Sequence, residues 1–158
     1  MADSFTTSLA GTASVSSSNK ATDAAQIVTP PMYFPVHGLA ADTDFTILLW
    51  APVTPITVAT LRIVPNLAIA ANDTNYISLG FSKSVLTAFS GTSIATAKTT
   101  QVTGGAAHVV GAVQSFTVTT AGSANNIAAG TGIYLVMSQQ GTGPTWAVTV
   151  EIGYTLQG

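Results

Sequence analysis

Hydrophobic and polar residues alternate strictly near the C-terminal end of the chain. Trp146, Val148, Val150, Ile152 and Tyr154 occupy one set of positions, and the residues between them are small, polar or charged. Because successive side chains of a β-strand point to opposite faces, this period of two predicts a half-buried strand over residues 146–155. Segments of similar character, which we also interpret as strands, lie at residues 45–50, 56–64, 76–82, 94–100, 109–119 and 133–138.

Turn-forming residues separate these segments. Examples are Pro65-Asn66, Asn72-Asp73 and Gly104-Gly105, and Gly141-Thr142-Gly143 is interpreted as a hairpin loop between two strands. Strong helix formers are scarce, and the sequence allows only a short helix over residues 84–89. About seven or eight short strands at this spacing predict an all-β protein, either an antiparallel β-sandwich or a closed barrel.

One pattern occurs twice. Residues 68–73 (Ala-Ile-Ala-Ala-Asn-Asp) and residues 126–131 (Asn-Ile-Ala-Ala-Gly-Thr) each combine an isoleucine, small residues and a turn, and each precedes an expected strand. We interpret both as corners where a hydrophobic plug, Ile69 or Ile127, enters the core. The repeated corner favours a double Greek-key sandwich, in which related crossovers occur in each half.

The first 29 residues differ from the rest. They show no sustained alternation and contain few large apolar groups beyond Phe5 and Leu9, so they cannot offset their own ordering entropy. We therefore expect an extended N-terminal arm over residues 1–29 and a β-sandwich domain over residues 30–158. A proline-rich cluster at residues 30–36 follows the arm and contains Met32, Tyr33 and Phe34. These three side chains either contact another chain or cover the end of the core.

Charge is scarce throughout the chain. Charged residues make up 6% of the 158 residues, where soluble domains have about 25%, and the net charge is −2. Nucleic-acid binding needs clustered Lys and Arg, which are absent, so no nucleic-acid partner is expected. Mean hydropathy is +0.47, but the longest strongly apolar run, residues 47–53, is too short to span a membrane. No signal peptide is apparent, so we expect synthesis in a cytoplasm without export.

Catalytic motifs are missing, and we expect neither an enzyme nor a cofactor. His37 and His108 are candidate metal ligands, although lone histidines in β proteins more often satisfy a local hydrogen bond. Asp42 and Asp44 have a spacing that calcium can use, but a turn before the strand at residue 45 is the favoured interpretation. Trp50 and Trp146 are interpreted as core or rim packing, with a sugar-binding platform as the alternative.

Three segments carry a resemblance to a known group of proteins. Residues 61–76 (LRIVPNLAIAANDTNY), residues 126–132 (NIAAGTG) and residues 146–154 (WAVTVEIGY) resemble small virion proteins of tailed bacteriophages, and in particular their head decoration, or cement, proteins. The resemblance covers roughly residues 45–155 and leaves the arm outside. It implies a jelly-roll-like antiparallel β-sandwich, and it transfers no active site.

The resemblance also implies a role. It suggests a structural protein on the outer surface of a capsid head that stabilises the shell by bridging major capsid proteins. Its partners would be the major capsid protein and further copies of itself, with a homotrimer favoured over a dimer. Phe5, Leu9, Met32, Tyr33 and Phe34 are the candidate contacts to the capsid or to a neighbouring copy. The alternative is a receptor- or carbohydrate-binding β-sandwich of a phage tail or fibre.

Overall fold

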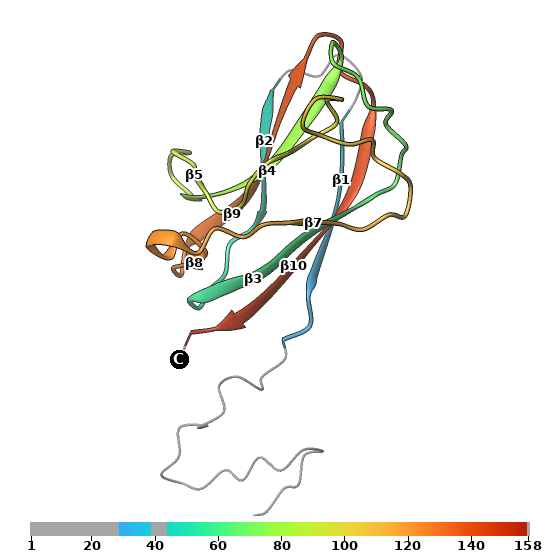
Figure 1. Cartoon of the computed structure of the whole chain (residues 1–158). Coiled ribbons are helices and arrows are strands. Elements are labelled where there is room, and N and C mark those ends of the chain that lie inside the picture. Colours follow the sequence, from blue (N-terminus) through green and yellow to red (C-terminus); the bar gives the residue numbers. More distant parts are fainter. Residues whose placement is uncertain (1–28, 39–43, 158) are drawn as a thin grey trace, which may run out of the picture.

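Two antiparallel β-sheets form the domain in the computed structural model, which describes residues 29–38 and 44–157. The first sheet contains β1 (Met32–Gly38), β10 (Trp146–Leu156), β3 (Ile56–Pro65) and β7 (Gln114–Phe116) in that order, with β8 (Asn126–Ile127) also paired to β3. The second contains β2 (Phe45–Trp50), β9 (Thr131–Gln140), β4 (Tyr76–Val85) and β5 (Thr92–Ser93), with β6 (Lys98–Thr99) also paired to β4. Figure 1 shows the two sheets as two layers of the domain.

The chain passes repeatedly from one sheet to the other. β1, β3, β7, β8 and β10 lie in the first sheet, whereas β2, β4, β5, β6 and β9 lie in the second. The first strand therefore pairs with the last, β10, and the second pairs with the last but one, β9. This order, produced by folding long hairpins across two sheets, is the double Greek-key arrangement of a jelly roll. The expected all-β sandwich is confirmed.

The core lies between the inner faces of the sheets, where the period-two pattern placed it. In β10, Trp146, Val148, Val150 and Ile152 are all at most 1% exposed, and the residues between them are only partly buried. From the second sheet, Leu79 of β4 is completely buried in the same cluster. The alternation in the sequence thus marks the inner face of each long strand.

One side of the sandwich is closed by the chain itself. The Ile94 N–H donates to the Phe81 carbonyl of β4 at 2.9 Å, and Ala95 forms an isolated bridge with Val118, beyond β7 of the first sheet. Residues 94–97 thus connect the edges of both sheets. The edge strands on the opposite side are β1 and β2.

The repeated corner acts as predicted. Ile69 is 4% exposed and Ile127 is completely buried, and both belong to the hydrophobic core. The strands that follow them, β4 and β9, lie side by side over ten residues each. Each corner therefore leads into one of two neighbouring strands of the second sheet.

Two expected strands are much shorter than predicted. Only β6 forms within residues 94–100. Ile94 and Ala95 are consecutive and both buried, because this segment crosses between the two sheets and does not lie within one. Only β7 forms within residues 109–119, since Val109 and Val110 are exposed and Gly111 has a φ of +75°.

Two further expectations were wrong, and one strand was not predicted. No helix forms at residues 84–89: β4 continues to Val85, and the Ser84 hydroxyl then ties a turn by donating to the Ala88 carbonyl at 3.0 Å. Residues 141–143 join β9 to β10, which lie in different sheets, so the loop is a crossover and not a hairpin. The proline-rich segment is strand β1 itself, which tolerates Pro35 because β1 is an edge strand.

The described part of the chain contains only a short 3-10 helix, Ala121–Ser123, and therefore no helix with the length and hydrophobicity needed to cross a membrane.

Replacement of Leu79 by alanine tests the assignment of the core. Leu79→Ala should lower the free energy of unfolding by about 2–5 kcal/mol, because it removes a completely buried side chain and leaves a cavity. Leu156→Ala is the matched control, since Leu156 lies at the end of β10 and is 46% exposed. Denaturant unfolding of both variants measures the difference. Equal losses would contradict the inner face described here.

Candidate functional site

The three candidate contact residues of β1 do not share one face. Met32 and Phe34 are paired in register with the buried residues Ile152 and Val150 of β10, and both pack against the core. Tyr33 is paired with Glu151, points to the outer face of the first sheet and is 60% exposed. Of these three residues, Tyr33 is therefore the one that offers most of its side chain to another molecule.

The start of the described chain is attached to the same sheet. The Thr29 hydroxyl donates a hydrogen bond to the Tyr154 carbonyl of β10. Thr29, the first described residue, is therefore fixed to the strand next to β1, the edge strand that carries Tyr33. Phe5 and Leu9, the other two candidate contacts, lie outside the described residues.

An ion pair lies on the outer face of the first sheet. Arg62 of β3 donates from Nη1 to Glu151 Oε1 of β10 at 3.1 Å, and the two residues are direct neighbours in register. The side chains are 42% and 16% exposed, so the pair contributes at most about 1 kcal/mol to stability. It holds both charges beside Tyr33, which is the cross-strand neighbour of Glu151.

The other charged side chains of the described residues also have partners within the chain. Lys83 donates to the carbonyls of Ser123 and Asn126 at 3.1 and 2.7 Å. The Lys98 ammonium lies over the Phe116 ring, 5.9 Å from its centroid.

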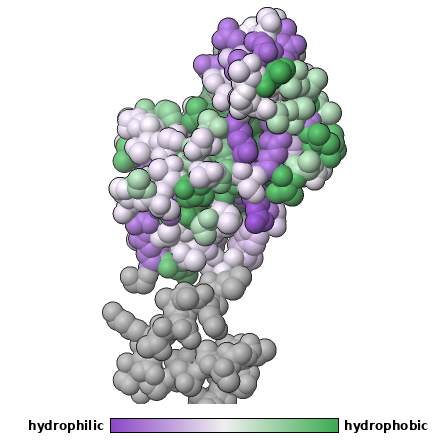
Figure 2. Space-filling view, in the orientation of Figure 1, coloured by the Kyte–Doolittle hydropathy of each residue, from purple (hydrophilic) through white to green (hydrophobic). Residues whose placement is uncertain are grey.

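The two aspartates each accept a backbone hydrogen bond. The Asp44 carboxylate accepts the Gln139 N–H at 2.9 Å, and the Asp73 carboxylate accepts the Thr103 N–H at 3.0 Å. Asp44 therefore joins the start of β2 to β9, while Asp42, the other carboxylate of the alternative calcium interpretation, lies outside the described residues. The surface around these anchored charges is mostly uncharged: Figure 2 shows white and green residues over much of the visible face, with purple ones in separate groups.

The two histidines occupy different environments. His37 is exposed on β1, whereas His108 is 2% exposed and exchanges two backbone hydrogen bonds of 2.9 Å with Ile69. Neither ring nitrogen of His108 has a hydrogen-bond partner. Burial, and to a lesser degree the nearby charge of Lys98, lower the pKa of His108 below its ordinary value of 6.5. Within residues 29–38 and 44–157, no three His, Asp or Glu side chains are grouped to hold a metal ion.

The tryptophans serve packing. Trp146 is 1% exposed and stacks on Phe45, with ring centroids 5.6 Å apart. Trp50 is partly buried against the core and lies 4.8 Å from the Tyr154 ring. The interpretation of both residues as core or rim is confirmed, and Trp146 has no face free for a sugar ring.

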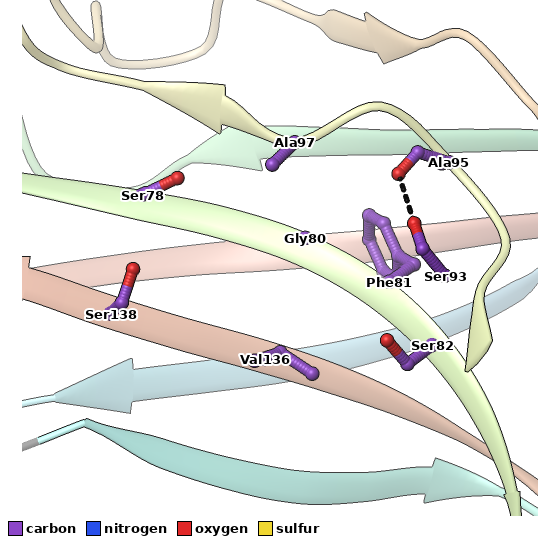
Figure 3. A pocket seen from close by; sticks show the side chains of 9 residues that line it. All are labelled: Ser78, Gly80, Phe81, Ser82, Ser93, Ala95, Ala97, Val136 and Ser138. Carbon is purple, nitrogen blue, oxygen red and sulfur yellow. Dashed lines mark hydrogen bonds between the residues drawn. The ribbon is translucent and has the colours of Figure 1, made fainter. Parts of the chain in front are cut away.

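A shallow hollow of about 190 Å³ lies on the outer face of the second sheet, a feature that sequence reasoning missed (Figure 3). Small and uncharged residues line it, and they supply no nucleophile–base pair or carboxylate: Ser78, Gly80, Phe81, Ser82, Ser93, Ala95, Ala97, Val136 and Ser138. Its volume is below the roughly 300–1,000 Å³ of most small-molecule sites. No sequence motif could have revealed it, because serines and alanines at these positions carry no chemical signature.

No protein-family model matches the chain, and no curated protein matches it. Among solved structures, the chain is similar to one in "Structure of infectious bursal disease virus Gx strain", with 13% sequence identity and a TM-score of 0.32. The match covers 82% of this chain and 33% of that chain, so the protein spans about a third of the length of the chain it resembles.

The burial of His108 predicts acid sensitivity. Its pKa is lower in the folded than in the unfolded protein, so the unfolded state binds more protons as the pH falls below about 6.5. The contribution of His108 to the free energy of unfolding should therefore be constant above that pH and decrease below it, until the imidazole of the folded protein also becomes protonated. Denaturant titrations between pH 8 and pH 5 measure this slope.

The matched variants are His108→Leu and His37→Leu. His108→Leu should reduce the slope between about pH 6.5 and 5, whereas His37→Leu should retain it, because His37 is exposed. An unchanged slope in His108→Leu would show that another group causes the acid sensitivity.

Proposed function

We propose that this protein is a structural virion protein that decorates and stabilises a bacteriophage capsid by bridging major capsid proteins. The observation that supports the proposal is that the charged side chains of the domain bind groups of the chain itself. Each of the six charged side chains within residues 29–38 and 44–157 has a partner in the chain itself: Asp44, Arg62, Asp73, Lys83, Lys98 and Glu151. The other described residues carry no Asp, Glu, Lys or Arg side chain, and they are rich in Ser, Thr, Ala and Val.

Such a surface suits permanent contact with other proteins. Burial of an ion at an imperfect contact costs several kcal/mol, whereas hydroxyl and methyl groups are covered at much lower cost. A neutral surface also gives a protein little electrostatic protection against association. Both properties favour a subunit of an assembly over a freely diffusing catalyst, and absence of enzymatic activity is part of the proposal.

Stabilisation of the shell follows from mass action. A protein that binds the assembled capsid, and not its separate subunits, stabilises the assembled form by its binding free energy. Many copies, each in contact with two neighbouring subunits, then resist the pressure of packaged DNA. The protein would be made in the host cytoplasm and would end on the outer surface of the head, with the major capsid protein and further copies of itself as its partners.

The proposed contacts converge on the edge of the first sheet. Tyr33 is exposed there, and Thr29, the first described residue, is hydrogen-bonded to the neighbouring strand β10. The arm with Phe5 and Leu9 would extend from this edge to a capsid subunit or to a neighbouring copy. Met32 and Phe34 belong to β1 and pack against the core, so they would support this edge indirectly by holding β1 in place.

Reconstitution of capsids tests the function and the role of the arm. The full chain, added to expanded capsids that lack it, should appear on the head lattice in electron cryomicroscopy. A variant without residues 1–29 should retain the melting temperature of the domain and lose capsid binding, because the domain core lies between residues 36 and 152.

The two failures are distinguishable. Absence of the full chain from the head lattice would contradict the proposed function. Full occupancy by the truncated variant would leave the function intact and contradict the role of the arm. Tyr33→Ser is the point variant for the same edge, and it should weaken capsid binding at least several-fold.

A further inference from the structure

The strands of the second sheet direct no charged side chain to its outer face, and one carboxylate borders it: Asp44, which precedes β2, accepts the N–H of Gln139 beside Ser138. Ser78, Gly80 and Ser82 of β4 point outward, since they alternate with buried residues. Lys83 and Lys98 are paired in register with the buried residues Ile133 and Leu79, so both lysines are directed away from this face. The first sheet differs, because its outer face carries the Arg62–Glu151 ion pair.

An apolar ridge occupies one end of this face. Leu48 of β2 and Leu86 cover Gly132 of β9: a Cβ added at Gly132 would lie 2.6 Å from Leu48 Cδ1 and 3.0 Å from Leu86 Cδ2. Phe89 packs edge-on against Tyr134, with ring centroids 5.0 Å apart. Leu48, Leu86 and Phe89 are nevertheless 45–49% exposed. The ridge of Leu48, Leu86, Phe89 and Tyr134 therefore leaves apolar surface uncovered.

The hollow described above lies beside the ridge. Tyr134 is the cross-strand neighbour of Ser82, which lines the hollow. A Cβ added at Gly91 would lie 2.5 Å from the Phe89 ring and 3.1 Å from Ser82 Cβ, so the ring borders the hollow at its Ser82 end. In Figure 3, Ser78, Ser82, Val136 and Ser138 surround Gly80, which has no side chain, and the Phe81 ring lies at the Ser93 end of the hollow. One face thus carries a protrusion and a recess next to each other.

We propose that this face is the interface between two copies of the chain, related by a two-fold axis, with the ridge of each copy in the hollow of the other. A two-fold interface uses the same patch on both subunits, so a patch that contains both a ridge and a hollow is self-complementary. Once both hollows are filled, neither copy has this face left for a third. The proposed pairing therefore gives a dimer, whereas the resemblance to decoration proteins favours a trimer.

The size of the face can be compared with that of known interfaces. β4 and β9 have ten residues each, β2 has six and β5 has two, so at about 3.3 Å per residue and about 4.8 Å between strands the sheet gives a flat area of about 440 Å². The ridge adds to this area, and a standard interface buries about 800 Å² on each partner. The one carboxylate at its border, Asp44, already accepts a backbone hydrogen bond, so a second copy can cover the face at low desolvation cost, and the ridge supplies an apolar anchor of the kind that stable interfaces contain.

The pairing specifies the self-association within the proposed function, and it depends on that function only for its role on a capsid. The full chain should be a dimer in light scattering and sedimentation. Ser138→Glu adds a charge at the hollow, and Phe89→Ser removes the exposed ring of the ridge. Each should raise the dimer dissociation constant about tenfold or more.

Two matched variants serve as controls. Ser115→Glu places the same charge on the outer face of the first sheet, where Ser115 is paired with Arg62, and Val110→Ser removes a side chain that is 57% exposed in a loop. Both should leave the dissociation constant within about twofold of the original. Thermal unfolding should show that all four variants remain folded.

A full chain that is monomeric or trimeric would overturn the two-fold pairing, as would a dimer that survives both Ser138→Glu and Phe89→Ser. Because neither result depends on a capsid, failure of the pairing and failure of the proposed function are separate outcomes. A stable dimer that leaves capsids undecorated would contradict only the function.

Discussion

The structure depends on how few ionic groups the chain has and on where it places them. Of the ten charged residues, Asp3, Lys20, Asp23 and Asp42 lie outside the described residues, and each of the other six is satisfied by another group of the chain. Asp44 and Asp73 fix backbone amides, and Lys83 fixes two carbonyls. Charge therefore serves the fold, and the exterior is left to hydroxyl and methyl groups that a protein partner covers at little cost.

Much of the fold could be predicted because burial of one face of a strand leaves a period of two in the sequence. The long strands β3, β4, β9 and β10 each have one face toward the core, the alternation is clearest in β10, and the bounds of all four lie close to the prediction. The corners with Ile69 and Ile127 were also predictable, since a lone large side chain among small ones indicates a plug.

Elements stabilised by tertiary contacts could not be predicted in the same way. The prolines of β1 argue against a strand, and only its position at a sheet edge makes Pro35 acceptable. Residues 94–97 bridge the two sheets, so they bury Ile94 and Ala95 consecutively and show no alternation. The candidate site was predicted in part. The sequence singled out Tyr33, but the exposed Leu48, Leu86 and Phe89 are the residue types that sequence reasoning assigns to a core.

The central claim is that the exterior binds protein partners without ionic contacts, and the salt dependence of capsid binding tests it most directly. Salt screens exposed charge pairs strongly and leaves apolar and hydrogen-bonded contacts nearly unchanged. The affinity of the full chain for expanded capsids should therefore vary by less than about threefold between 50 and 500 mM NaCl. A loss of about a hundredfold or more over this range would show that ion pairs hold the protein to the shell, and would contradict the account.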